Sequence, residues 1–284
     1  MTSWAAAREF VFRDARLVER RLFATMFEGA PADGVARAVR AYRNDDGGLG
    51  HALEPDVRCP ESQPLFVLFG LTPLASVGAR DDDLLTSCCE FLETVADDRG
   101  AVPIILPSAA DYPRAEHWTN ARLPPSLQPT IGIAASLHAL GFTHRWLDHA
   151  TDYCLDELKR GPEPEAHLLR EVLRFLDVVD EPALRDRAVA AIPGAEDFRA
   201  DPTSTDYGLT PLQMIPTSSL ARELFAADLL DAHLDTLERD QRDDGGWPLD
   251  WDPPTAAAGL EWRGQRTVEA LEILRTYDRL PPDA

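Results

Sequence analysis

The chain has 284 residues and, with 28 Lys and Arg against 49 Asp and Glu, a formal net charge of −21 at pH 7. Its 44% hydrophobic and 27% charged residues are typical of a folded globular protein and exclude a disordered chain. Phosphate backbones and anionic lipids bind chiefly through Lys and Arg, so the acidic balance argues against nucleic acids and membrane surfaces as partners.

The termini and the cysteines indicate a cytoplasmic protein. Near the N-terminus no basic segment precedes an apolar stretch, so no secretory signal is predicted, and no window is apolar enough for a membrane span. Cys88 and Cys89 are adjacent on an apolar helical pattern, which is typical of reduced core thiols, and the sequence contains no Cys-x-x-Cys pair. We therefore expect no structural zinc and no cofactor.

Helical periodicity dominates the chain and predicts an all-α fold in a single domain spanning residues 1–284. The expected helices are, in chain order, 4–28, 31–43, 63–77, 81–96, 128–141, 143–160, 163–179, 181–191, 217–240 with a break, and 264–278. Ser62 and Ser126 are expected to cap the helices that follow them, and the one short strand candidate is 102–106. Long loops rich in Gly, Pro and Asp occupy 44–62, 97–127, 192–216 and 241–263. Such loops are usually functional.

An internal repeat is the strongest signal in the sequence. Residues 43–50, Arg-Asn-Asp-Asp-Gly-Gly-Leu-Gly, recur at 241–248 as Gln-Arg-Asp-Asp-Gly-Gly-Trp-Pro, and a degenerate copy occupies 96–103. Each copy ends one amphipathic helix and is followed by a loop and a second helix. These second helices begin at Gln63, Gln128 and Gln265. Because repeated units stack on their neighbours, we expect the loops to gather on one face.

The copy at 237–247 resembles the QW repeat of squalene and hopene cyclases, in which a Leu and a Gln precede Gly-x-Trp. Residues 262–268 are similar to the re-entry into an inner helix that follows such repeats. Protein prenyltransferase β subunits share the same arrangement of helical hairpins. The resemblance implies an α/α toroid of about five or six hairpins around a central cavity. It also implies a protein that binds or transforms an apolar small molecule, isoprenoid or polycyclic.

The acid motifs of these families are missing from the chain. There is no Asp-x-Asp-Asp string, with which the cyclases protonate their substrates, and the acidic run 81–83 is predicted to begin a helix, where it suits the helix dipole. Asp152 and Cys154 have the spacing of the zinc-binding Asp-x-Cys of the prenyltransferases, but they lie within a predicted outer helix. We therefore expect no metal site.

The loop 44–62 contains the candidate catalytic residues Glu54, Asp56 and His51. Two carboxylates around Pro55, with a histidine close by, could supply a general acid and a general base. In a cavity with little water, repulsion and desolvation would raise the pKa of one carboxyl group. The structural alternative is that the two acids cap helices or pair with Arg58.

Aromatic and polar residues of all four loops complete the predicted site. The candidate substrate-binding residues are Arg58, Gln63, His117, Trp118, Tyr207, Asp250, Trp251, Asp252 and Trp262. Trp side chains and a few carboxylates around a cavity mouth suit an apolar or cationic small molecule, and they equally suit a sugar. Because an acidic mouth repels free diphosphates, we expect an apolar or neutral ligand.

Two other functions remain open. One is a carbohydrate-active toroid enzyme that uses Glu54 with Asp56 and Asp250 with Asp252 as its acid pairs. The other is a non-catalytic module that binds a protein partner. A deep pocket lined by Leu, Phe and Trp would favour the apolar ligand, a shallow acidic groove the sugar, and a filled centre the binding module.

Overall fold

A computed structural model describes residues 2–118, 123–215 and 218–280. These residues form thirteen α-helices, three short 3-10 helices and only isolated β-bridges, so the all-α prediction is confirmed. The α-helices are α1 (Trp4–Asp14), α2 (Leu17–Glu28), α3 (Asp33–Arg40), α4 (Pro64–Val77), α5 (Asp82–Val95), α6 (Leu127–Ala139), α7 (Arg145–Arg160), α8 (Ala166–Leu176), α9 (Pro182–Ala191), α10 (Pro211–Met214), α11 (Ser218–Leu224), α12 (Ala227–Arg239) and α13 (Ala256–Thr276). None of the helices described is long and apolar enough to cross a membrane.

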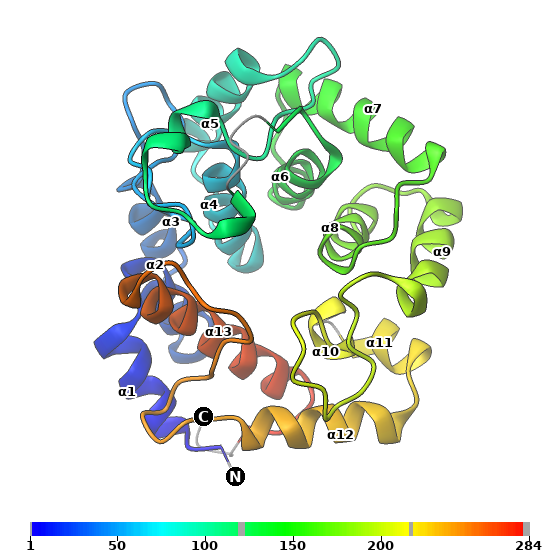
Figure 1. The fold of residues 1–284 in the computed structure, drawn as a ribbon. Coiled ribbons are helices and arrows are strands. Elements are labelled where there is room, and N and C mark those ends of the chain that lie inside the picture. Colours follow the sequence, from blue (N-terminus) through cyan, green and yellow to red (C-terminus); the bar gives the residue numbers. More distant parts are fainter. Residues whose placement is uncertain (1, 119–122, 216–217, 281–284) are drawn as a thin grey trace.

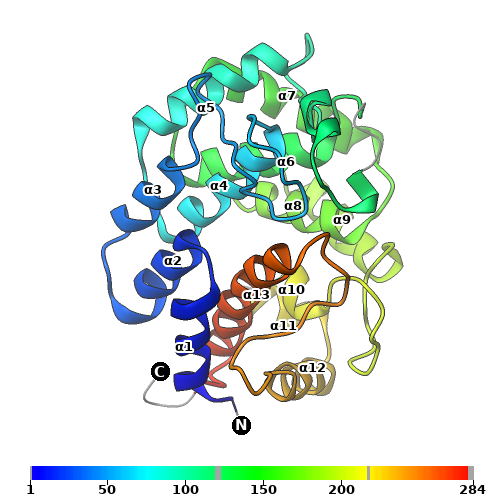
Figure 2. The ribbon, with the colours of Figure 1, turned by 60° about the vertical axis from the view of Figure 1, so that its left-hand side comes forward.

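The helices follow one another around the molecule (Figure 1). Helix α4 packs on α6 and α6 on α8, and these lie inside α5, α7 and α9. Helix α13 returns to the start of the chain and packs against α1 and α2, as both ribbon views show (Figures 1 and 2). One cluster of buried side chains extends from α2 and α3 to α9, and a second joins α1, α2, α12 and α13.

Most helix ends lie within three residues of the sequence prediction, but two regions differ more. The predicted helix 4–28 is two helices, because the backbone at Ala15 and Arg16 is extended. Helix α13 begins at Ala256, eight positions before the predicted start at 264, and the side chain of Thr255 caps it by accepting from the N–H of Ala258. Gly264, which suggested a helix start, lies inside α13, where a Cβ would be 2.5 Å from that of Ala15.

The predicted cap at Ser62 and the predicted strand are wrong. Gln63, and not Ser62, is the N-cap residue of α4. Ser126 does occupy the N-cap position of α6, but its side chain makes no cap bond there. The Ser62 hydroxyl instead donates to Asp46 at 2.6 Å. Residues 102–106 form no strand, and Val102 makes only an isolated bridge to Ser126.

The three copies of the sequence repeat fold into the same turn. In each copy the first glycine, Gly47, Gly100 or Gly245, has a φ between 86° and 94° and donates its N–H to a carbonyl three residues back. The next residue is Gly48, Ala101 or Gly246. Its carbonyl accepts from the backbone N–H four residues back, and its own N–H donates to an aspartate side chain. The aspartates that recur in the sequence are therefore part of the turn itself.

Each turn presses its first glycine against the backbone of another outer helix. A Cβ on Gly47 would be 2.7 Å from the Ser87 carbonyl oxygen of α5, and one on Gly100 would be 2.8 Å from the Cβ of His149 in α7. A Cβ on Gly245 would overlap the carbonyl of Ala6 in α1. The last turn of the chain thus packs on the first helix.

Gln241 reinforces this junction between the two ends of the chain. Its side-chain amide donates to the carbonyls of Ser3 at 2.9 Å and Gly245 at 3.0 Å, and its oxygen accepts from the N–H of Ser3 at 2.6 Å. Trp247 is buried, and its indole N–H donates to the Leu237 carbonyl at 2.7 Å. Both side chains therefore have a structural role around this turn.

We predict that Gly245→Ala destabilises the protein far more than Gly29→Ala. Both glycines have a positive φ, 94° and 70°, which costs an alanine about 1 kcal/mol. A Cβ on Gly29 meets nothing within 4 Å, whereas one on Gly245 displaces the backbone of α1, so the loss should be about 1 kcal/mol for Gly29→Ala and about 3 kcal/mol or more for Gly245→Ala. Urea unfolding measures both, and equal losses would contradict close packing of this turn on α1.

Candidate functional site

The loop that contains the candidate acids reverses its direction at two strained residues. His51 and Ala52 have φ values of 57° and 56°, a region that residues other than glycine rarely adopt. Their N–H groups donate to the carbonyls of Pro60 at 3.1 Å and Cys59 at 2.9 Å. Backbone strain of this kind is concentrated at functional sites. Here it turns residues 53–58 toward the interior.

A short ladder of backbone hydrogen bonds joins this loop to the loop between α5 and α6. The N–H of Arg58 donates to the Pro113 carbonyl at 2.9 Å, and the N–H of Ala115 donates to the Asp56 carbonyl at 2.8 Å. The ladder brings His117 to Asp56, with 4.0 Å between Nε2 and Oδ2. Two loops far apart in the sequence therefore meet at one carboxylate.

Glu54 and Asp56 are buried side chains with unpaired oxygens. They are 2% and 3% exposed, and neither Glu54 Oε2 nor Asp56 Oδ1 has a hydrogen-bond partner within the described part of the chain. Burial, with Asp56 close by, raises the pKa of Glu54 well above its ordinary value. Burial also raises the pKa of Asp56, against the opposing effects of Trp262, His117 and Trp251.

The cations nearest to this pair already have anionic partners. Arg16 forms an ion pair with Glu19 and donates to the Leu53 carbonyl, while Arg58 forms an ion pair with Glu261 at 2.5 Å. Burial lowers the pKa of His117, which favours its neutral form. Glu54 and Asp56 therefore form no ion pair with an arginine in the described part of the chain, and burial favours the protonated form of Glu54.

Aromatic rings adjoin the carboxyl pair. Trp262 contacts Phe69 and Trp251 edge-to-face, with ring centres 5.6 and 5.1 Å apart, and Trp251 contacts Tyr207 at 6.2 Å. The indoles of Trp251 and Trp262 approach Asp56 closely enough to lower its pKa, but neither N–H makes a hydrogen bond of ordinary geometry to a described residue. Free N–H donors therefore lie beside free carboxyl oxygens.

The other predicted residues lie in varied surroundings. His51 and Asp252 are exposed, and His117 stacks at a tilt on Trp118, whose indole N–H is buried without a partner in the described residues. Gln63 is fully buried and fixes the following loop, accepting from the Leu106 N–H at 2.6 Å. The structure therefore brings Glu54, Asp56, Arg58, His117, Trp251 and Trp262 together, and it leaves His51, Gln63 and Asp252 outside this group.

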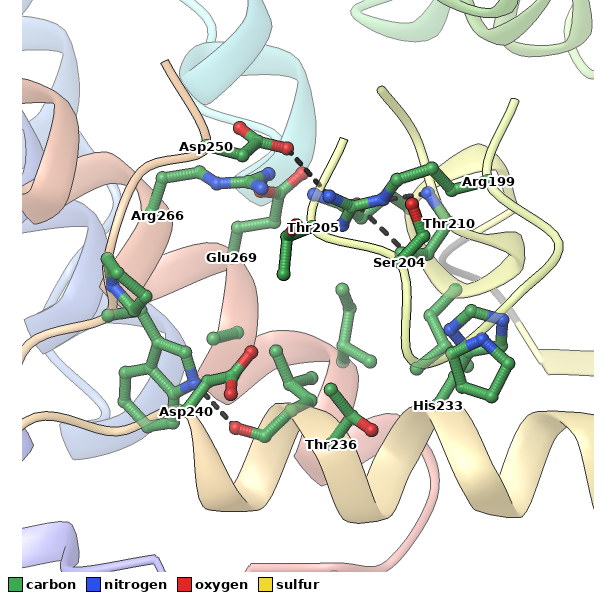
Figure 3. A pocket seen from close by; sticks show the side chains of 18 of the residues that line it. Arg199, Ser204, Thr205, Thr210, His233, Thr236, Asp240, Asp250, Arg266 and Glu269 are labelled. Carbon is green, nitrogen blue, oxygen red and sulfur yellow. Dashed lines mark hydrogen bonds and ion pairs between the residues drawn. The ribbon is translucent and has the colours of Figure 1, made fainter. Parts of the chain in front are cut away.

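A pocket of about 330 Å³ lies between α12, α13 and the segment 199–213 (Figure 3). Asp250 lines it and accepts from Arg199 at 3.1 Å, while the next residue, Trp251, belongs to the aromatic group described above. Arg266 and Glu269, which form an ion pair at 2.7 Å, face the same space. Sequence analysis missed Arg199, Arg266 and Glu269, although Arg266 and Glu269 follow Trp262 by four and seven residues and so share its helical face.

Ion pairs link this pocket to helix α8. Arg170 lies 3.8 Å from Glu269 and 3.6 Å from Glu171, and Glu171 accepts from Arg174 at 2.6 Å. Charged side chains therefore extend from this pocket to α8. No group of three or more His, Cys, Asp or Glu side chains within the described residues is arranged to hold a metal ion.

Comparison with known proteins gives no relative for this chain. No protein-family model matches it, and no curated protein matches it significantly. Any function must therefore be argued from the site.

We predict that Glu54→Gln removes a pH-dependent part of the stability. Because the folded pKa of Glu54 is raised, its contribution to stability is complete below the unfolded pKa of about 4.3 and is lost as pH rises through the folded pKa. The difference in unfolding free energy between wild type and variant should therefore shift in favour of the variant as pH rises, by about 1.4 kcal/mol per unit of raised pKa. Urea titrations across this range test the prediction, and a difference independent of pH would contradict it.

Proposed function

We propose that the helices form an α/α toroid, with α2, α4, α6, α8 and α13 on the inside and α1, α3, α5, α7, α9 and α12 outside. The packing of α13 on α1 and α2, which joins the last helix to the first, supports this assignment. The three equivalent turns against outer helices support it as well.

We propose that the protein is an enzyme that moves a proton to and from a small molecule, with Glu54 as the general acid and Asp56 as the general base. The observation that carries this proposal is a buried carboxyl pair that, within the described residues, has two unpaired oxygens and no ion pair to an arginine. A neutral acid beside a more easily ionised one is the arrangement that acid–base catalysis needs at neutral pH. His117, which faces Asp56, would relay the proton to solvent.

The surroundings of the pair favour a substrate that is uncharged at its reacting part. An anion beside two carboxyl groups in a site of low polarity would be repelled. The edges and faces of Phe69, Trp251 and Trp262 offer an apolar wall and stabilise positive charge that develops on protonation. The free indole N–H groups would bind an oxygen of the substrate. An isoprenoid-like or polycyclic alcohol or ether has these features.

A sugar is the second candidate substrate, and the pocket beside Trp251 favours it. Ser204, Thr205, Thr210 and Thr236 line this pocket, so it offers hydroxyl groups along with its charged residues. It does not resemble the deep cavity of Leu, Phe and Trp that an entirely apolar ligand would require. Paired carboxyl groups next to Trp rings serve glycoside cleavage as well as protonation of an alkene.

We predict that Glu54→Gln and Asp56→Asn each lower turnover by about 100-fold or more, the usual contribution of a general acid or base. Squalene-type alkenes, polycyclic alcohols and aryl glycosides are incubated with the protein, and the products are identified by mass spectrometry. Both side chains are buried, so each variant is first checked by circular dichroism and thermal unfolding.

Glu61→Gln is the matched control. Glu61 lies in the same loop but is exposed and accepts from the Tyr112 hydroxyl at 2.8 Å, so turnover should change less than about twofold. Folded variants of Glu54 and Asp56 that retain full turnover would exclude the pair from catalysis. Conversion of aryl glycosides but not of alkenes would select the sugar as the substrate class.

A further inference from the structure

We infer that the pocket between α12, α13 and the segment 199–213 binds a small organic monoanion, a carboxylate on an apolar body of about six to eight carbons. This inference concerns a group outside the carboxyl pair, and it holds whether or not Glu54 and Asp56 are catalytic. Three features support it. One arginine has hydrogen-bond donors without partners in the described residues, a network of ion pairs has an excess positive charge, and the pocket is lined by both polar and apolar side chains.

Arg199 presents unused donors to the pocket. Its Nη1 donates to the Asp206 carbonyl at 2.5 Å and to Asp250 at 3.1 Å. Its Nε is buried without a partner, and its Nη2 makes no hydrogen bond within residues 2–118, 123–215 and 218–280. Nε and Nη2 form one edge of the planar guanidinium, which binds the two oxygens of a carboxylate side by side.

Arg266 approaches Arg199 from the opposite wall of the pocket, with Asp250 and Glu269 beside them (Figure 3). Like Arg199, it uses only Nη1 within the described chain, as the donor to Glu269 at 2.7 Å. A carboxylate between the two arginines could therefore accept from both. Thr205 and Thr210 lie on the same side of the pocket as the two arginines.

The ion pairs around these arginines have one positive charge in excess. Arg199 and Asp250 form a balanced pair, whereas three guanidinium groups share two carboxylates in a second, partly buried network, which consists of Arg170, Arg174 and Arg266 with Glu171 and Glu269. The remaining charged residues of the pocket, Asp201, Asp240 and Arg242, are exposed at its rim, where water screens them. One bound anion would balance the partly buried network.

Two titrating groups beside the network respond to its positive charge. Burial would raise the pKa of Glu269, yet Arg266 and Arg170 hold it below the ordinary value. Burial, together with the same two arginines, lowers the pKa of His167 to about 4, so His167 adds no further charge at neutral pH. The excess cation therefore persists across the neutral range.

Apolar side chains also line the pocket and limit the shape of the ligand. They belong to Leu212, Leu237, Trp247, Ala270 and Ile273. A volume of about 330 Å³ lies at the lower end of the range for small-molecule pockets, which suits a short-chain or single-ring acid. The negative charge of a polyvalent anion such as a diphosphate would exceed the one unbalanced positive charge of the network.

Calorimetric titration of the intact chain with hexanoate, hexanamide and inorganic phosphate tests the inference. Hexanoate should bind and raise the melting temperature, and hexanamide should bind at least about tenfold more weakly because it lacks the charge. Phosphate, which has no apolar body, should bind more weakly than hexanoate. Equal binding of hexanoate and hexanamide, or no binding of carboxylates from acetate to decanoate, would overturn the inference.

Variants locate the ligand. Arg199→Gln and Arg266→Gln should each weaken hexanoate binding at least about tenfold, whereas Arg37→Gln on the exposed face of α3 should leave it unchanged. Thr236→Phe fills the pocket without altering its charge and should abolish binding, which covers the case in which an arginine variant fails to fold. Glu54→Gln should bind hexanoate as the wild type does, so loss of turnover and loss of this site are separable. Hexanoate binding that survives Thr236→Phe and both arginine variants would place the ligand elsewhere.

Discussion

The close approach of a glycine turn to an outer helix is the contact on which the rest of the structure depends. Gly47, Gly100 and Gly245 have nearly the same φ and lie against the backbones of α5, α7 and α1. Only a residue without a Cβ permits this approach at this backbone conformation. Since the last of these turns meets the first helix, the same local contact that joins neighbouring hairpins also joins the two ends of the chain.

This junction determines which loops meet. The loop after the first turn brings in Glu54 and Asp56, the loop after the second brings in His117, and the segment after the third brings in Trp251 and Trp262. Glu54, Asp56 and Trp251 lie outside the helices, whereas His117 belongs to the short 3-10 helix Glu116–Trp118 and Trp262 to α13. The site therefore depends on packing between repeats more than on any single motif.

Two groups of buried and partly buried charged residues differ in their charge balance. Arg16 and Arg58, which lie beside Glu54 and Asp56, already have anionic partners, and burial disfavours the ionisation of both carboxyl groups. A few residues further along α13, Arg266 belongs to a network with more arginines than acids. A chain of net charge −21 thus combines an acidic exterior with a locally cationic interior. The carboxyl pair and the pocket adjoin because Trp251 and Asp250, which contribute to one each, are consecutive residues.

The sequence by itself determined the helical class, most helix positions and the three repeated turns, because these follow from local periodicity and from glycine and aspartate in short range. It also singled out Glu54, Asp56, Trp251 and Trp262, since acids and aromatic residues are conspicuous in long loops. Only the tertiary structure decided that the two acids are buried and that neither forms an ion pair with an arginine in the described part of the chain, because Arg58 pairs with Glu261 of α13 and Arg16 with Glu19 of α2. It likewise decided that α13 starts at Ala256 and that Arg199 faces Arg266 across a pocket. Arg58 and Glu261 are 203 positions apart and Arg199 and Arg266 are 67 positions apart, and no local pattern specifies such pairings.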